Sequence, residues 1–95
     1  MEYIARISWL SPEEGGRKGQ IPFNTNRYGP LIRHKNGQGN WSILVNNYEQ
    51  LGNLLTLAKM QYLNTENAPK DLAVGLRFEL YEGLQKVADG ENIDY

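Results

Sequence analysis

The stretch that decides the fold is residues 74–87, which read VGLRFELYEGLQKV. Phe78 and Leu80 alternate with polar or amphipathic neighbours, which is the two-residue period of a strand with one buried face. Glu82-Gly83 follows at once, and glycine accepts the positive φ that a two-residue hairpin turn requires. The stretch therefore predicts a β-hairpin that turns at Glu82-Gly83.

That turn would place Phe78 opposite Val87 on one face of the hairpin and Glu79 opposite Lys86 on the other. A cross-strand pair of opposite charge contributes roughly 0.2–1 kcal/mol. An isolated hairpin is marginal in water, so we expect this one to belong to a larger sheet.

Three earlier segments also predict strands, and two of them, residues 2–10 and 41–45, show the same alternation. Residues 2–10 place alternate apolar side chains on one face, and Pro12 ends the run because proline cannot donate to a strand ladder. Residues 28–35 predict a second strand, and residues 41–45 predict a third, short one.

The segments between these strands are rich in turn-forming residues. Residues 11–27 hold three glycines and two prolines; the segment is long for a connection, and we expect Ile21 and Phe23 to anchor it to the body. The other turn signals predict a hairpin loop at residues 36–40, a loop bracketed by Asn46-Asn47 and Gly52-Asn53, and a loop at residues 64–73. From Asp89-Gly90 onward we expect a tail that frays or adds a brief strand.

Residues 54–63 fit two structures. Apolar side chains fall at helical spacing there and Asn47 is a suitable helix cap. Alternate residues of the same segment also fit a strand that is partly covered on both faces. The pattern alone leaves helix and strand open, whereas the neighbouring short strands favour another strand, because a sheet needs a partner here.

The sequence thus predicts an all-β protein of about six strands joined mostly by short turns. A closed six-stranded antiparallel β-barrel suits these strands because closure leaves no unpaired edge, and a sandwich is the alternative. Small barrels are filled by side chains, so no ligand cavity is implied. The expected core residues are Ile7, Trp9, Ile43, Leu57, Phe78 and Leu80.

Composition sets further bounds. The chain has 95 residues, a formal net charge of −1 and no cysteine. That length suits one domain (residues 1–95), and the absence of cysteine excludes disulfides and thiolate metal sites. The first 47 residues carry six Lys or Arg and three acidic residues, and the remainder carries four and eight. We find no secretory leader and no apolar run of the roughly 18 residues that span a membrane, and expect a cytoplasmic protein without membrane contact.

Three segments together resemble the third, carboxyl-terminal domain of translation elongation factor Tu, and they occur in that family's order. The likeness covers almost the whole chain, and its glutamate-glycine-glycine-arginine and glycine-leucine-arginine-phenylalanine motifs are fairly specific in combination. The segments are residues 10–17 (LSPEEGGR) followed by Pro22-Phe23, residues 28–30 (YGP), and Pro69 followed by residues 75–78 (GLRF), residues 82–83 (EG) and Val87.

The resemblance implies a six-stranded antiparallel β-barrel and a strand at residues 54–63. In the family this barrel packs on a GTPase domain, contacts the T-stem backbone of aminoacyl-tRNA and meets the nucleotide-exchange factor. Arg17 matches the signature arginine near the tRNA, and Gly83 matches the turn glycine that approaches the RNA. Two positions that are polar in the family are Leu31 and Ala68 here. No phosphate-binding Gly-x-x-x-x-Gly-Lys-Ser/Thr motif occurs, so we expect neither GTP binding nor GTPase activity.

We therefore expect a stand-alone, non-catalytic barrel that binds another protein, either in translation or as an immunity-like protein that neutralises an agent directed at the factor. It needs no cofactor and no metal. The alternative is binding to the backbone of tRNA or another RNA through a basic segment. The candidate binding residues are Arg17, Lys18, Arg27, Arg33, Lys35 and Gly83.

The remaining chemistry-bearing residues suggest structural roles. His34 is the only histidine and is expected to be a solvated strand residue, without partners for a metal site or a nucleophile. The loop before Arg17 could bind an anion through its backbone, or Arg17 could pair with Glu13 or Glu14. Three further residues are expected in the core or on the barrel exterior rather than on a ligand: Trp9, Trp41 and Arg77.

Overall fold

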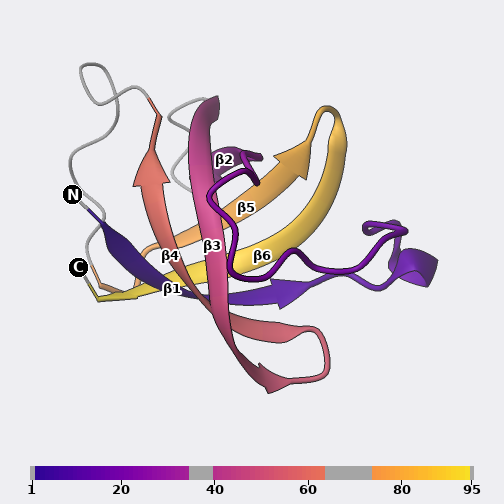
Figure 1. Ribbon diagram of the computed structural model, residues 1–95. Helices are drawn as coiled ribbons and strands as arrows, with labels where there is room; N and C mark the ends of the chain where they lie inside the picture. Colours follow the sequence, from indigo (N-terminus) through magenta and orange to yellow (C-terminus); the bar gives the residue numbers. More distant parts are fainter. Residues whose placement is uncertain (1, 35–39, 64–73, 95) are drawn as a thin grey trace.

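The computed structural model describes residues 2–34, 40–63 and 74–94 of the chain. Its strands close into one barrel in the order β1-β4-β3-β2-β5-β6, and every neighbouring pair is antiparallel (Figure 1). The predicted all-β, six-stranded closed barrel is therefore confirmed, and the sandwich alternative is wrong. The strands are β1 (Tyr3–Trp9), β2 (Leu31–His34), β3 (Asn40–Gly52), β4 (Leu55–Tyr62), β5 (Arg77–Glu82) and β6 (Gln85–Asp94), with a short 3-10 helix η1 (Pro12–Glu14) after β1.

The segment that fitted two structures is strand β4. Alternate residues of β4 point inward and are buried, while the intervening residues lie outside. Leu57, predicted in the core, is one of the outward residues and is only half-buried. Leu57 pairs with Arg6 of β1. Residues paired across two strands share a face of the sheet, so the side chains of Leu57 and Arg6 both lie on the outer face.

The barrel interior is filled by side chains from all six strands. Five of the six predicted core residues are buried, Leu57 being the exception. Trp41 packs against this core while remaining partly exposed. The buried apolar residues are Tyr3, Ala5, Ile7, Trp9, Ile32, Ile43, Val45, Ala58, Met60, Tyr62, Phe78, Leu80, Val87 and Ala88.

The β5–β6 hairpin forms, but its register differs from the prediction. Glu82 pairs with Gln85, so the turn residues are Gly83 and Leu84, and a bulge follows between Leu80 and Tyr81. Phe78 consequently lies opposite Gly90. A Cβ atom at Gly90 would lie less than 3.0 Å from the Phe78 ring, so only glycine fits opposite this ring.

The predicted ion pair survives the change of register. Lys86 lies opposite Tyr81, and its Nζ atom reaches diagonally to 3.0 Å from Glu79 Oε2. The same Nζ atom lies 2.9 Å from Asp89 Oδ1. The expected tail from Asp89-Gly90 continues β6 to Asp94 and pairs with β1, which closes the barrel.

Strand β3 continues past Asn46-Asn47, where the sequence predicted a loop. Asn47 is fully buried, and its Oδ1 atom accepts a hydrogen bond of 2.8 Å from Thr56 Oγ1. Thr56 Oγ1 accepts one of 2.9 Å from Trp9 Nε1, while Asn47 Nδ2 donates to the carbonyl oxygen of Pro22 at 2.8 Å. Both ends of the Asn47 side-chain amide are therefore hydrogen-bonded inside the sheet. Strand β3 continues through this residue as far as Gly52.

Residues 10–30, here called the strap, run out past η1 and return across the barrel wall to β2 (Figure 1). Ile21 packs against the core and Phe23 forms a parallel bridge with Asn47, so the predicted anchoring of this connection is confirmed. The carbonyl oxygens of Tyr28 and Pro30 accept hydrogen bonds from Val45 and Ile43 of β3. The strap thus extends the pairing of the short strand β2.

His34 is buried, with 2% of its surface exposed, and the prediction of a solvated residue is wrong. Ile32 and His34 are the inward residues of β2. His34 Nε2 lies 2.6 Å from Tyr62 Oη, and Nδ1 is buried without a partner in the described part of the chain. Burial lowers the pKa of the imidazole below its ordinary value, so His34 is a neutral core residue near pH 7.

Candidate functional site

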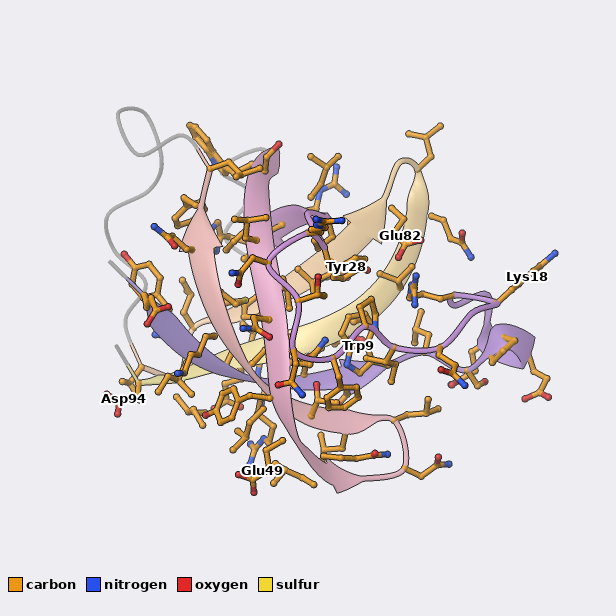
Figure 2. All side chains as sticks on the ribbon, viewed as in Figure 1. Trp9, Lys18, Tyr28, Glu49, Glu82 and Asp94 are labelled. Atoms are coloured by element: carbon orange, nitrogen blue, oxygen red, sulfur yellow. The ribbon has the colours of Figure 1, made fainter. Side chains whose placement is uncertain are left out.

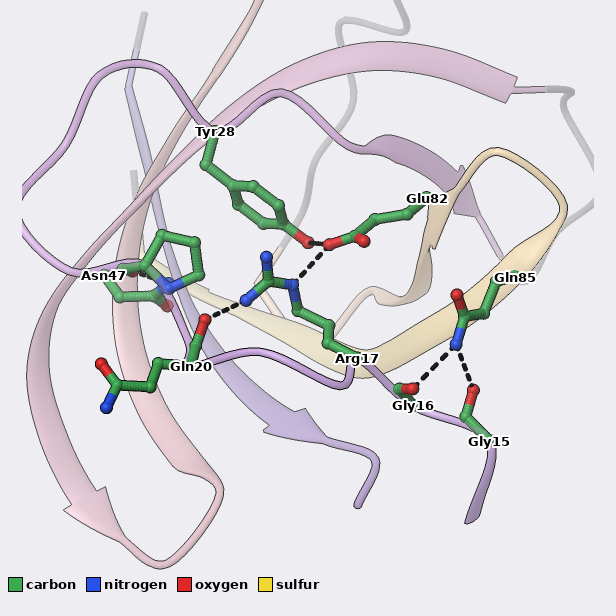
Figure 3. Close-up of polar contacts among 9 residues, drawn as sticks. Gly15, Gly16, Arg17, Gln20, Tyr28, Asn47, Glu82 and Gln85 are labelled. Atoms are coloured by element: carbon green, nitrogen blue, oxygen red, sulfur yellow. Dashed lines mark hydrogen bonds and ion pairs between the residues drawn. The ribbon is translucent and has the colours of Figure 1, made fainter. Parts of the chain in front are cut away.

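The strap is fastened to the β5–β6 hairpin by three side chains, here called the clasp: Arg17, Tyr28 and Glu82 (Figure 3). Arg17 Nε and Tyr28 Oη both donate to Glu82 Oε2, each at 2.6 Å. The Arg17 guanidinium also lies 5.3 Å from the centre of the Tyr28 ring and donates to the carbonyl oxygen of Gln20. Burial and the neighbouring Glu82 raise the pKa of the Tyr28 hydroxyl above its ordinary value, so it stays protonated and donates.

The clasp corrects one expectation about Arg17. Its partner is Glu82, 65 residues away, rather than Glu13 or Glu14. Glu14 instead exchanges hydrogen bonds with Ser11 in a capping box at η1. Hydrogen bonds from Ser11, that of its backbone N–H first, lower the pKa of the Glu14 carboxyl group. The charge of Arg17 is therefore already paired within the barrel.

The glycine pair before Arg17 does not form the anion-binding concavity that the sequence allowed. The N–H groups of Gly15 and Gly16 donate to the carbonyl oxygens of Pro12 and Ser11 at 3.1 and 2.9 Å. Their own carbonyl oxygens accept from Gln85 Nε2 at 2.8 and 2.7 Å (Figure 3). The loop is a second attachment of the strap to the hairpin.

The hairpin tip held by these two attachments is exposed. Gly83 has a φ of 62°, which glycine adopts readily, and the fully exposed Leu84 (102%) stands next to it. Arg33 places its guanidinium 5.5 Å from the centre of the Tyr81 ring. A hollow of about 190 Å³ lies between Arg33, Tyr81, Gly83 and Leu84; these four residues are called the tip pocket below.

The structure brings only some of the predicted site residues together. Arg33 and Gly83 line the tip pocket, and Arg17 holds the neighbouring Glu82. Lys18 points away from the barrel at the outer bend of the strap (Figure 2). Arg27 is exposed, and Lys35 lies outside the described residues.

Sequence reasoning missed Tyr81 and Leu84. Leu84 follows the turn glycine directly, but the predicted turn at Glu82-Gly83 assigned it to a strand. Had the turn been placed one residue later, Leu84 would have been recognised as an exposed apolar tip residue. The alternation of residues 76–81 already places Tyr81 on the face opposite Leu80, but nothing in the sequence shows that Arg33 lies next to it.

A second hollow, of about 260 Å³, lies on the outside of β1, β5 and β6. Arg77 lines it opposite Glu91, as expected for a residue on the barrel exterior. Arg6 lies 3.5 Å from the Glu91 carboxylate, and Asp89 pairs with Lys86. Acidic and basic groups alternate across this surface, and it carries no dominant charge.

Residues 2–34, 40–63 and 74–94 contain no cluster of three or more His, Asp or Glu side chains that could hold a metal ion. Within the same ranges, no helix is both long enough and apolar enough to cross a membrane. No protein-family model matches the chain, and no curated protein matches it significantly.

Proposed function

We propose that the protein is a non-catalytic binding module that engages another protein through the tip of the β5–β6 hairpin. We also propose that the barrel is related to the carboxyl-terminal barrel of elongation factor Tu, because the motifs at residues 10–17, 28–30 and 75–78 resemble that family. The proposal also includes a cytoplasmic location, with which the absence of cysteine is compatible.

The observation that carries the proposal is the full exposure of Leu84 on a braced hairpin. Burying a leucine side chain is worth roughly 1.5–3 kcal/mol, and a tip residue of a lone barrel gains none of this. The attachments through Gln85 and Glu82 hold the tip in place before any partner arrives. A preformed site loses less conformational entropy on binding, so this tip is suited to protein recognition.

The biological setting follows from the proposed kinship. A barrel of this family could dock on a GTPase domain, as the factor's own barrel does, and so act in translation. It could equally neutralise a protein that targets the factor, as an immunity protein does. Both settings require a protein partner, and neither requires chemistry by the barrel.

RNA-backbone binding is the alternative, and the exposure of Lys18 and Arg27 is compatible with it. The engagement of Arg17 by Glu82 weakens it, because this arginine would have to leave its partner to meet a phosphate. Phosphate contacts make affinity fall steeply with salt. A titration with tRNA at low and moderate salt tests the alternative, and binding that is absent even at low salt would exclude it.

The proposal is tested by recovering partners from the native cell with tagged wild-type protein and two variants. Leu84→Ser removes the exposed tip side chain. Leu51→Ser is the matched control, because Leu51 is also an exposed leucine (44%) but lies near the β3–β4 turn, at another corner of the barrel (Figure 1). We expect a stoichiometric protein that is lost with Leu84→Ser and retained with Leu51→Ser. Equal recovery with both variants, or no protein partner, would contradict the proposal.

A further inference from the structure

We infer that the tip pocket accepts the carboxylate of a single aspartate or glutamate from the protein partner, next to an apolar side chain that covers Leu84. This inference rests on the proposed function, since it names the chemistry of the partner at the same hairpin tip. Three properties of the pocket support it: its size, its charge and the apolar surface beside it.

The size of the pocket favours one side chain over a free small molecule. Its volume is about 190 Å³, whereas pockets for small-molecule ligands usually measure roughly 300–1,000 Å³. Leu84 forms one wall and projects fully into solvent, so the pocket is open at the place where a partner's surface would continue. An occupant attached to a larger surface fits this shape.

The charge of the pocket favours one carboxylate. Arg33 lies opposite Glu79 in the β2–β5 register, but Glu79 is already engaged by Lys86 Nζ at 3.0 Å and by the Tyr81 hydroxyl, also at 3.0 Å. Glu82 is likewise neutralised by Arg17. Arg33 has no ion pair within the described ranges, and its guanidinium is the charged group that lines the pocket.

One guanidinium in the pocket lining suits a single carboxylate better than a polyphosphate backbone. Glu79 lies opposite Arg33 in the β2–β5 register and would repel a run of phosphates. Stacking on Tyr81 holds the Arg33 guanidinium, and a guanidinium presents paired donors that match a carboxylate. The pocket is therefore arranged for one planar, singly charged acceptor.

The apolar neighbour follows from the walls of the pocket. The Tyr81 ring and the Leu84 side chain line it together, and covering Leu84 with an apolar group removes two apolar surfaces from water at once. A partner segment with an acid beside leucine, isoleucine or an aromatic residue meets both requirements. Arginine and aromatic residues are also typical of the residues that dominate binding energy at protein interfaces.

The probe for this inference is a random 12-residue peptide library displayed on phage and selected on the immobilised full-length protein. We expect the enriched peptides to share an acid next to a large apolar residue. A synthetic copy of the most enriched peptide is then titrated by calorimetry against the wild type, Arg33→Gln, Leu84→Ser and Leu51→Ser. The first two variants should weaken binding at least about tenfold, and Leu51→Ser should leave it unchanged.

A matched peptide in which the acid is replaced by its amide completes a double-mutant cycle. We expect the amide to lose as much affinity as Arg33→Gln does, and the two changes together to lose little more than either alone. Independent, additive losses would overturn the pairing of Arg33 with the carboxylate. Enrichment of basic peptides, the absence of any enrichment, or tRNA binding at low salt that Arg33→Gln abolishes would also overturn it.

The proposed function and this inference can fail separately. If the cellular partner depends on Leu84 but binds the Arg33→Gln variant normally, the hairpin tip is the binding site and the carboxylate assignment is wrong. If neither variant affects a recovered partner, both the site and the chemistry are wrong.

Discussion

Replacing Gly90 with alanine should destabilise the barrel, although this change usually stabilises a strand. Gly90 lies in β6 between Ile7 of β1 and Phe78 of β5. An added Cβ atom would stand less than 3.0 Å from Cε1 and Cζ of Phe78 and 3.1 Å from Cε2. The Phe78 ring is fully buried and among the largest core side chains, so it has little room to move.

The expected magnitude follows from two opposing effects. Alanine should gain about 0.5–1 kcal/mol over glycine in a strand because the unfolded chain is less flexible. Forcing an extra carbon into a packed core costs about 1–3 kcal/mol, occasionally more. The overlap with a buried ring places Gly90→Ala in the upper part of that range. We expect a net loss of about 2 kcal/mol in the free energy of unfolding, or roughly 10 °C in Tm.

Urea denaturation followed by tryptophan fluorescence measures this change. Gly19→Ala is the control, because nothing lies within 4 Å of a Cβ atom there, and it should leave the stability within about 0.5 kcal/mol of the wild type. Phe78→Leu combined with Gly90→Ala should cost less than the sum of the single changes, since the smaller side chain makes room for the new methyl group. A Gly90→Ala variant as stable as the wild type would refute the packing argument.

Three further predictions concern buried polar groups and the clasp. Thr56→Val should cost about 1–3 kcal/mol in urea denaturation, because it leaves the buried Trp9 Nε1 without its acceptor. The folded-state pKa of His34 is lowered, so its contribution to stability should be complete above about pH 6.5 and fall as the pH drops toward the lowered pKa; His34→Phe should remove this part of a stability–pH curve. Arg17→Met should cost only about 1 kcal/mol, because the pair with Glu82 is partly solvated; a loss above 3 kcal/mol in thermal unfolding would show that the clasp carries far more of the fold.

The strands could be predicted because their alternation is local. In β1 and β5, residues two positions apart lie on the same face of the strand. This period of two is visible in the sequence. Residues 54–63 needed more than alternation, since the same residues also fit a helical period. The strand there depends on pairing with β1 and β3 on both sides, which no local pattern records.

The failures arose where a distant residue decides the local structure. Asn47 looks like a turn residue, yet Thr56 and Pro22 satisfy its amide inside the sheet. The hairpin register brings the Phe78 ring against Gly90, where only glycine leaves room for it, and the turn glycine alone did not reveal this pairing. The same applies to His34, whose burial follows from its inward position on β2.

The candidate site was only partly predictable for the same reason. Arg17, Arg33 and Gly83 were named from the residue motif and the charge pattern, and they do lie around one hairpin tip. Their roles were not visible, because the partner of Arg17 is Glu82, far along the chain. The exposure of Leu84 depends on a turn whose position is fixed by the bulge between Leu80 and Tyr81.

The central claim is that another protein contacts the hairpin tip, and site-specific photocrosslinking in the native cell tests it most directly. A photoreactive amino acid is placed at position 84 in one strain and at position 51 in another, and crosslinked products are resolved by mass after irradiation. The account predicts one discrete protein adduct from position 84 and none of the same mass from position 51. Adducts to RNA alone, or the same protein adduct from both positions, would contradict it.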